Sequence, residues 1–269
     1  MLINELGRFN PSRECRTFSS TPNSFYKLND IEVDYSSQHQ LAVSNSFLHG
    51  EHEISQIEGA LRTIKDCIKD NKNYSNLYQA TAIPFCLSLP ETMPDVGTQL
   101  EENWLPSLKL HYEKQVQGGY FKATLQGHTK LSKHLTVAKG SGYENFLGQL
   151  SNSTVVGYYF PTAFQEFDIN SQRKRIASLP EIKSLALCLS GPIEIAYSLL
   201  CYPKLLFNLK HYSPILCASS LEHQDPRMII LFKSYGPHLE FWLMTQMLTP
   251  TKTQVSEQWS GGITIYKTL

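Results

Sequence analysis

Thiol, imidazole and carboxylate side chains in the first 170 residues are the set that could carry covalent chemistry. The candidates are the thiols of Cys15, Cys67 and Cys86, the imidazoles of His128 and His134, and the carboxylate of Asp168. A cysteine is nucleophilic as the thiolate, which a paired histidine or a helix N-terminus favours. Cys67 lies late in a predicted helix, and the catalytic set that we retain is Cys15, Cys86, His134 and Asp168.

A histidine on a predicted strand, followed by the aspartate of "EFDINS", has the chain order that is common in papain-like cysteine enzymes. The resemblance implies a cysteine-dependent hydrolase or protease in the N-terminal part of the chain. In the competing interpretation, His134 and Asp168 are ordinary core or surface residues. The sequence leaves both interpretations open.

Three short motifs could bind small ligands. "HGEHE" at 49–53 has two histidines three apart, but it lacks the spacing of a zinc-protease helix and fits a solvated helix start. "KGSG" at 139–142 leads into a predicted helix and could hold an anion there, although it matches neither common phosphate-binding glycine motif. "RKR" at 173–175 fits an exposed link between domains. We therefore expect no metal and no cofactor.

Charge and cysteine usage restrict the class of partner and the compartment. The 24 basic and 24 acidic residues cancel, so no global field attracts nucleic acid, and we expect none to bind. Six cysteines without metal-site spacing indicate reduced thiols in a cytoplasmic compartment. The N-terminus lacks the apolar core of a secretory signal. Residues 184–203 are long enough to span a membrane, but Gly191, Pro192 and Glu194 argue against a span.

Residues 1–172 are predicted to form a mixed α+β domain of unknown activity. The segment 51–70 has isoleucine and leucine at helical spacing, which predicts a helix that packs one face on a core. A second helix is expected at 107–116. The expected strands are 82–89, 119–126, 134–139 and 153–160. Their order shows little regular β-α-β alternation, which favours an α+β arrangement.

Regularly spaced prolines dominate the rest of the chain. Seven prolines between Pro180 and Pro250 recur at intervals of 11 to 13 residues. Proline is tolerated in the first turn of a helix and is costly further inside, so this spacing permits only short helices. Short helices need neighbours to stack against. We therefore predict an all-α stack of short helices at 176–269, with an irregular helical bundle as the alternative.

Part of this region resembles the ankyrin repeat. "SPILCASS" at 213–220 is similar to the opening of the repeat, and "PRMIILFKSYGPHLE" at 226–240 is similar to its second helix and exit. "SGPIEIAYSLL" at 190–200 resembles the same second helix. The resemblance implies degenerate ankyrin-like repeats that bind a partner protein through a concave face and loop tips.

A mixed domain followed by such an array resembles the layout of host-directed bacterial effectors. The layout implies a protein-interaction function, a eukaryotic host protein as partner, and translocation into a host cell without a classical signal peptide. Polar residues near the predicted turns are the expected partner contacts, namely Lys210, His211, Glu222, His223, Gln224, Lys233 and His238. The oligomeric state is left open.

Overall fold

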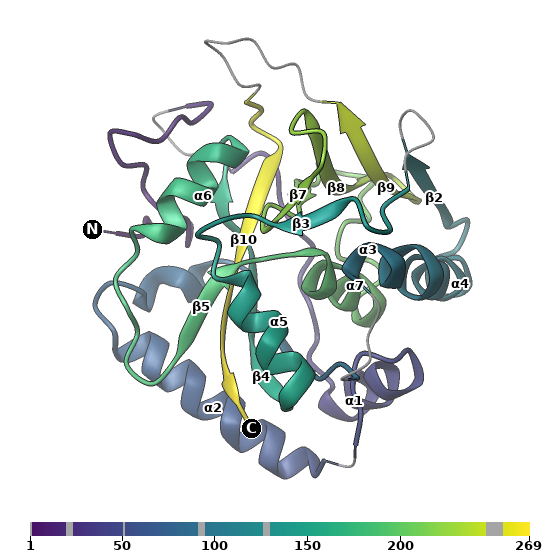
Figure 1. The fold of residues 1–269 in the computed structure, drawn as a ribbon, viewed down its shortest axis with the longest axis horizontal. Helices are drawn as coiled ribbons and strands as arrows, with labels where there is room; N and C mark the ends of the chain where they lie inside the picture. Colours follow the sequence, from purple (N-terminus) through teal and green to yellow (C-terminus); the bar gives the residue numbers. More distant parts are fainter. Residues whose placement is uncertain (1, 20–23, 51, 91–94, 126–129, 246–254) are drawn as a thin grey trace.

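A mixed β-sheet forms the centre of the fold in the computed structural model of this protein (Figure 1). The structure describes residues 2–19, 24–50, 52–90, 95–125, 130–245 and 255–269. The strands are β1 (Ile83–Leu87), β2 (Tyr120–Leu125), β3 (Leu135–Val137), β4 (Val155–Gln165), β5 (Ala186–Leu189), β6 (Ile215–Cys217), β7 (Leu221–His223), β8 (Met228–Tyr235), β9 (His238–Thr245) and β10 (Trp259–Thr268). Among the described residues, eight strands form one sheet in the order β1-β4-β10-β6-β8-β9-β2, with β5 also on β10.

The C-terminal strand β10 lies in the middle of this sheet. One edge of β10 pairs with β4 along most of its length, antiparallel, from Ser260 opposite Gln165 to Thr268 opposite Val155, with a register shift between Gly261 and Ile263. The other edge pairs with β6 in parallel and with β5 antiparallel. The predicted boundary between the N-terminal and C-terminal parts of the chain lies at residues 172–176, and strands from both sides of it therefore lie in one sheet. The pair β3 and β7 stands apart as a two-stranded sheet.

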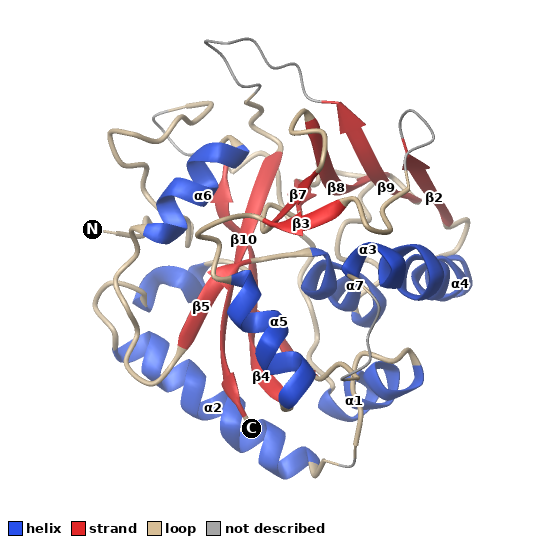
Figure 2. Ribbon diagram, in the orientation of Figure 1, coloured by secondary structure: helices blue, strands red, loops and turns tan. Residues whose placement is uncertain are grey.

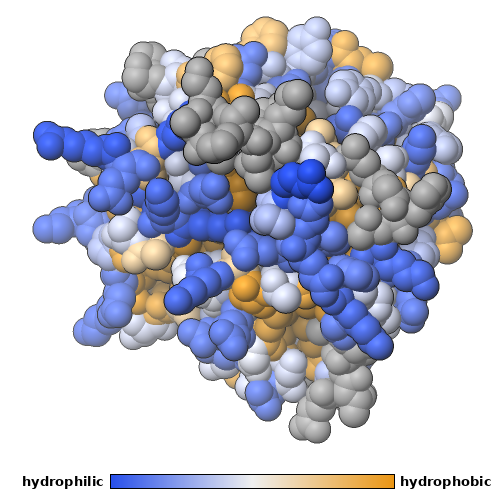
Figure 3. All heavy atoms as spheres, turned by 45° about the horizontal axis from the view of Figure 1, so that its top comes forward, coloured by the Kyte–Doolittle hydropathy of each residue, from blue (hydrophilic) through white to orange (hydrophobic). Residues whose placement is uncertain are grey.

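Helices pack against several strands of the sheet (Figure 2). They are α1 (Tyr35–Ser44), α2 (Ile54–Asp70), η1 (Ser75–Gln79), α3 (Val96–Gln99), η2 (Leu100–Trp104), α4 (Leu105–Gln115), α5 (Tyr143–Asn152), α6 (Ile169–Ala177) and α7 (Pro192–Cys201). Helix α2 packs against β4, α4 and α1 pack against α7, and α5 and α6 pack against β5. The face drawn in Figure 3 is covered largely by hydrophilic side chains, with hydrophobic ones visible between them.

The predicted elements of the N-terminal part are confirmed. Helix α2 buries Ile57, Leu61, Ile64 and Ile68, which are spaced three or four residues apart and so share one face of the helix. The predicted helix at 107–116 is α4, and the four predicted strands are β1, β2, β3 and β4. Glu51 lies outside the described residues.

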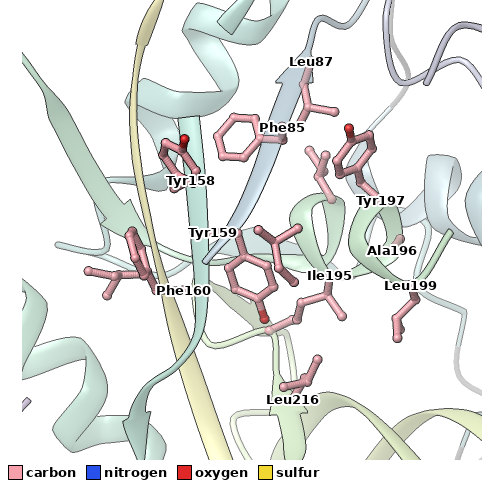
Figure 4. Packing of buried hydrophobic residues seen from close by; sticks show 14 of the residues in the cluster. Phe85, Leu87, Tyr158, Tyr159, Phe160, Ile195, Ala196, Tyr197, Leu199 and Leu216 are labelled. Carbon is pink, nitrogen blue, oxygen red and sulfur yellow. The ribbon is translucent and has the colours of Figure 1, made fainter. Parts of the chain in front are cut away.

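Part of the hydrophobic core lies between β4 and α7 (Figure 4). Every residue of β4 is buried, which is the pattern of a strand that is covered on both faces. Figure 4 shows Tyr159 of β4 pointing toward Ile195 of α7, with Phe85 of β1 nearby. Gly157 of β4 is needed for this packing, because a Cβ there would lie 2.6 Å from Phe85 and closer still to the carbonyl oxygen of Ile265.

The predicted all-α, ankyrin-like stack at 176–269 is wrong, and so is the irregular helical bundle. The supposed repeat opening at 213–220 contains β6, and the supposed second helix at 226–240 is β8 followed by the start of β9. Strands β8 and β9 form an antiparallel hairpin in which Tyr235 pairs with His238. A contiguous apolar run such as "MIILF" has no period that separates a buried strand from a buried helix, which explains the error.

The proline spacing led to the wrong prediction of short helices because proline also occurs just before strands and in the turns between them. Pro192 does begin a helix, α7, whose Glu194 carboxylate lies near the Gly191 N–H. Pro214 and Pro226, in contrast, precede β6 and β8, and Pro237 lies in the β8–β9 turn after Gly236, whose φ is 56°. Pro250 lies outside the described residues.

The long apolar segment at 184–203 is divided between a strand and a helix. It contains β5, a short connection at 190–191 and α7. None of the helices in the described parts of the chain has both the length and the apolar character that a membrane span requires.

Candidate functional site

Two of the four predicted catalytic residues lie near the start of α6. Asp168 is the N-cap of this helix and accepts from the Ser171 N–H at 2.6 Å, while its own N–H donates to the Arg16 carbonyl at 3.1 Å. Cys15 precedes Arg16, and its Sγ lies 3.2 Å from Ser12 Oγ and 3.8 Å from the Ser171 carbonyl oxygen. The structure therefore brings the Cys15 segment to Asp168, whose carboxylate caps the helix.

The other two predicted catalytic residues lie elsewhere. Cys86 is in β1, where burial raises the pKa of its thiol to about 12, so the thiol stays protonated at neutral pH. His134 Nδ1 donates to Gln224 Oε1 at 2.9 Å, and its ring lies against His223. Within the described residues, no hydrogen bond joins His134 to a cysteine. His128 lies outside them.

The small motifs occupy ordinary structural positions. Arg173 of "RKR" is on α6, where its guanidinium donates to the carbonyls of Ser219 and Leu221 and pairs with Glu222 at 2.6 Å. The interpretation of this motif as an exposed interdomain link is wrong for Arg173. In "HGEHE", His52 Nε2 lies 2.8 Å from Thr154 Oγ1. The described residues hold no cluster of three or more metal-ligating side chains.

The predicted partner contacts separate into two groups. Glu222, His223 and Gln224 lie on or next to β7, beside His134. The second group surrounds the β8–β9 turn and contains Lys210, His211, Lys233 and His238. Lys210 and His211 of the second group line a cavity that has large exposed apolar side chains at its edge.

This cavity, which we call the hairpin pocket, has a volume of about 310 Å³ and is lined by residues 208–213, residues 234–236 and Gln258. Asn208 forms a β-bridge with Gly236, which joins the 208–213 segment to the hairpin turn. The Asn208 Oδ1 accepts from the N–H groups of Lys210 at 2.8 Å and His211 at 2.7 Å. These bonds fix the shape of the loop.

Exposed apolar side chains surround the hairpin pocket. Leu209, Tyr212 and Tyr235 are 77%, 59% and 58% exposed, and we call these three residues the apolar rim. Tyr212 stacks on Phe25 with ring centroids 5.2 Å apart. The Tyr212 carbonyl accepts from the Lys27 N–H, so the rim is attached to the N-terminal segment as well.

The charges around the pocket are unbalanced. Lys210 and His211 line it, whereas no carboxylate of the described residues does. Two nearby acids are engaged elsewhere. Glu257 accepts from the Tyr26 hydroxyl at 2.9 Å, and Glu240 pairs with Lys233 at 3.4 Å and accepts from the Trp242 indole. The Lys233 ammonium also lies 4.0 Å from the centre of the Trp242 ring.

A separate polar cluster is enclosed in the core around Glu194, which has no exposed surface. Its Oε2 accepts from the Tyr143 hydroxyl at 2.8 Å and its Oε1 from Thr264 Oγ1 at 2.6 Å, and Thr264 Oγ1 in turn lies 2.8 Å from Ser190 Oγ. Burial raises the pKa of Glu194 from 4.5 to about 7, although the two hydroxyl donors oppose the rise. No cation among the described residues contacts this carboxyl group.

Sequence reasoning identified two of the pocket residues, Lys210 and His211, but missed the apolar rim. "KHYSP" and "KSYGPH" did place tyrosines beside turn residues, which is the signal that could have found Tyr212 and Tyr235. Comparison with protein-family models, with curated proteins and with solved structures finds no match to this chain.

Proposed function

We propose that this chain is a protein-binding protein whose contact surface is the hairpin pocket with its apolar rim. The observation that carries the proposal is the position of Leu209, Tyr212 and Tyr235, three large and mostly exposed side chains around one cavity. Large exposed apolar side chains that gather at one place are typical of interaction sites, and single scattered ones are not.

Tyrosine supports such a surface physically. Its ring offers a large apolar area at a low cost in side-chain entropy, while its hydroxyl remains solvated or bonds to the partner. Tyrosine is accordingly enriched among the few residues that dominate the binding energy of interfaces. The cavity between the rings can accept a side chain of the partner, which would fix the register of the complex.

The partner is proposed here only as a protein segment. The resemblance to host-directed effectors depended on an ankyrin-like array, and the strands of the C-terminal region remove that basis for a eukaryotic host partner. The cysteine-dependent hydrolase stays an untested prediction. No further contact of the described residues supports it, because His134 pairs with Gln224.

Selection from a phage-displayed random peptide library tests the proposal. Peptides enriched on the intact protein should lose affinity when Tyr212→Ala or Tyr235→Ala is introduced, by about fivefold to thirtyfold for each residue. The matched control is Leu110→Ala on α4, since Leu110 is 74% exposed and does not line the pocket. Melting temperatures should show that all three variants fold.

Two results would contradict the proposal. One is the enrichment of no peptide on the protein. The other is a set of enriched peptides whose affinity for the Tyr212→Ala and Tyr235→Ala variants equals their affinity for the unchanged protein. Because the rim side chains are exposed, a general loss of folding is not expected to confuse the comparison.

A further inference from the structure

We infer that the hairpin pocket takes a carboxylate side chain of the partner, so that the ligand is an acidic peptide with apolar residues next to the acid. This inference rests on the proposed function and specifies the chemistry of the same site. It follows from the hydrogen-bond donors of the pocket, from the charges around it and from the size of the charged area.

Two side-chain nitrogens at the pocket have no hydrogen-bond partner among the described residues. They are Asn208 Nδ2 and His211 Nε2, and both are buried. A buried polar group without a partner costs about 1 to 3 kcal/mol, so an acceptor brought by a ligand recovers free energy at these atoms. A carboxylate has two acceptor oxygens and no donor, so it suits the Asn208 NH₂ group, and it suits His211 Nε2 when this nitrogen carries the proton.

The orientation of the Asn208 amide is determined by its neighbours. Its oxygen must be the atom that accepts from the N–H groups of Lys210 and His211, because an amide nitrogen cannot accept from them. The NH₂ group is therefore the end left without an acceptor. Both nitrogens are buried in this structure, so a carboxylate reaches them only when side chains around the pocket move.

Charge complementarity also favours an acid. Lys210 adds an ammonium group to the wall of the pocket, and none of the described residues adds a carboxylate there. Glu257 and Glu240 lie near the pocket but are bonded to Tyr26 and to Lys233 and Trp242. A charge-assisted hydrogen bond is roughly twice as strong as a neutral one, so a carboxylate gains more at this site than an amide of the same shape.

The limited extent of the positive charge favours a peptide over a nucleic acid or a membrane. Binding to a phosphate backbone or to anionic lipid needs several lysines or arginines along a track. The cavity itself offers one lysine and one histidine beside apolar rings. This composition fits one carboxylate held between hydrophobic contacts.

Two fluorescein-labelled peptides test the inference by fluorescence anisotropy, one of alternating Glu and Tyr and the other of alternating Gln and Tyr. The Glu-Tyr peptide should bind the intact protein about tenfold more tightly or better. Asn208→Asp retains the oxygen that holds the loop and replaces the free donor with an acceptor, so it should weaken binding of the Glu-Tyr peptide about tenfold. Lys210→Glu changes an exposed side chain and should also weaken binding of the Glu-Tyr peptide.

The matched control is Lys183→Glu, which makes the same charge change in the groove next to β5 and should leave the affinity unchanged. Equal affinity for the two peptides overturns the inference but leaves the proposed function standing. The same conclusion holds if neither peptide binds while peptides selected from the library still bind. A third result also overturns the inference. In it, the protein binds phosphatidylserine vesicles or a single-stranded oligonucleotide, Lys210→Glu abolishes this binding, and the protein shows no preference for the Glu-Tyr peptide.

Discussion

The carboxyl group of Glu194 should make the stability of this protein fall as the pH rises. In the folded state the group is enclosed, receives hydrogen bonds from Tyr143 and Thr264, and has no cation beside it among the described residues. Burial raises its pKa from 4.5 to about 7. Between these two values the folded state keeps a proton that the unfolded state has released.

The sign and size of the effect follow from this difference. A group whose pKa is higher in the folded state binds more protons there, so its contribution is fully present below about pH 4.5 and is lost as the pH passes 7. At about 1.4 kcal/mol per pH unit, the change from 4.5 to about 7 corresponds to about 3 kcal/mol of unfolding free energy. This is a large share of the stability of an ordinary domain.

The variant Glu194→Gln removes the titration and keeps the shape. Near pH 5 its unfolding free energy should match that of the unchanged protein to within about 1 kcal/mol, since a protonated carboxyl group and an amide are similar in size and polarity. Near pH 8 the variant should be more stable by about 3 kcal/mol. Urea titrations at a series of pH values, followed by the fluorescence of the buried Trp104 and Trp259, measure the difference.

Two companion variants make the test specific. Glu144→Gln, on the exposed side of α5, should change the stability by a similar amount at both pH values. Tyr143→Phe removes a hydrogen bond to the carboxylate, so it should raise the pKa of Glu194 further and deepen the loss of stability at high pH. If the difference between Glu194→Gln and the unchanged protein stays constant from about pH 5 to about pH 8, the reasoning about Glu194 is refuted.

Three further outcomes are expected. Iodoacetamide should label the partly exposed Cys15 in the native protein but Cys86 only after unfolding, as mass spectrometry would show; equal rates would argue against the burial of Cys86. Gly157→Ala should destabilise by about 3 kcal/mol or more through overlap with β1 and β10, whereas Gly148→Ala, with open space on α5, should stabilise by about 0.5 to 1 kcal/mol in thermal melts. Arg173→Ala should reduce hydrogen-exchange protection in the turn before β7, and unchanged protection would contradict the role given to its three hydrogen bonds.

The sequence indicated the N-terminal elements because each has a clear local signal. Helix α2 alternates apolar and charged residues at a period that only a helix satisfies. Strand β9 had a signal as well: Leu239, Phe241 and Leu243 are buried at every second position, but the helix interpretation of the prolines outweighed it. Strand β8 had none, because consecutive buried positions suit a helix and a strand equally.

The candidate site was predictable only in part, because its two segments, 208–213 and 234–236, come together only when the chain folds. Lys210 and His211 could be chosen as polar residues near a turn. No pattern indicates that Asn208 pairs with Gly236, and without this contact Tyr212 and Tyr235 do not belong to one surface. Glu194 was visible as a lone acid in an apolar stretch, but its hydroxyl partners come from distant segments, Tyr143 on α5 and Thr264 on β10.

The central position of β10 also affects how the chain reaches this structure during synthesis. The ribosome makes β4 well before β10, and until β10 emerges one edge of β4 has no native partner. Long-range strand pairing of this kind is slow, and unpaired apolar edges favour aggregation. The nascent chain should therefore depend on chaperones that shield β4, and shortening the delay between the two strands by circular permutation should raise the yield of folded protein.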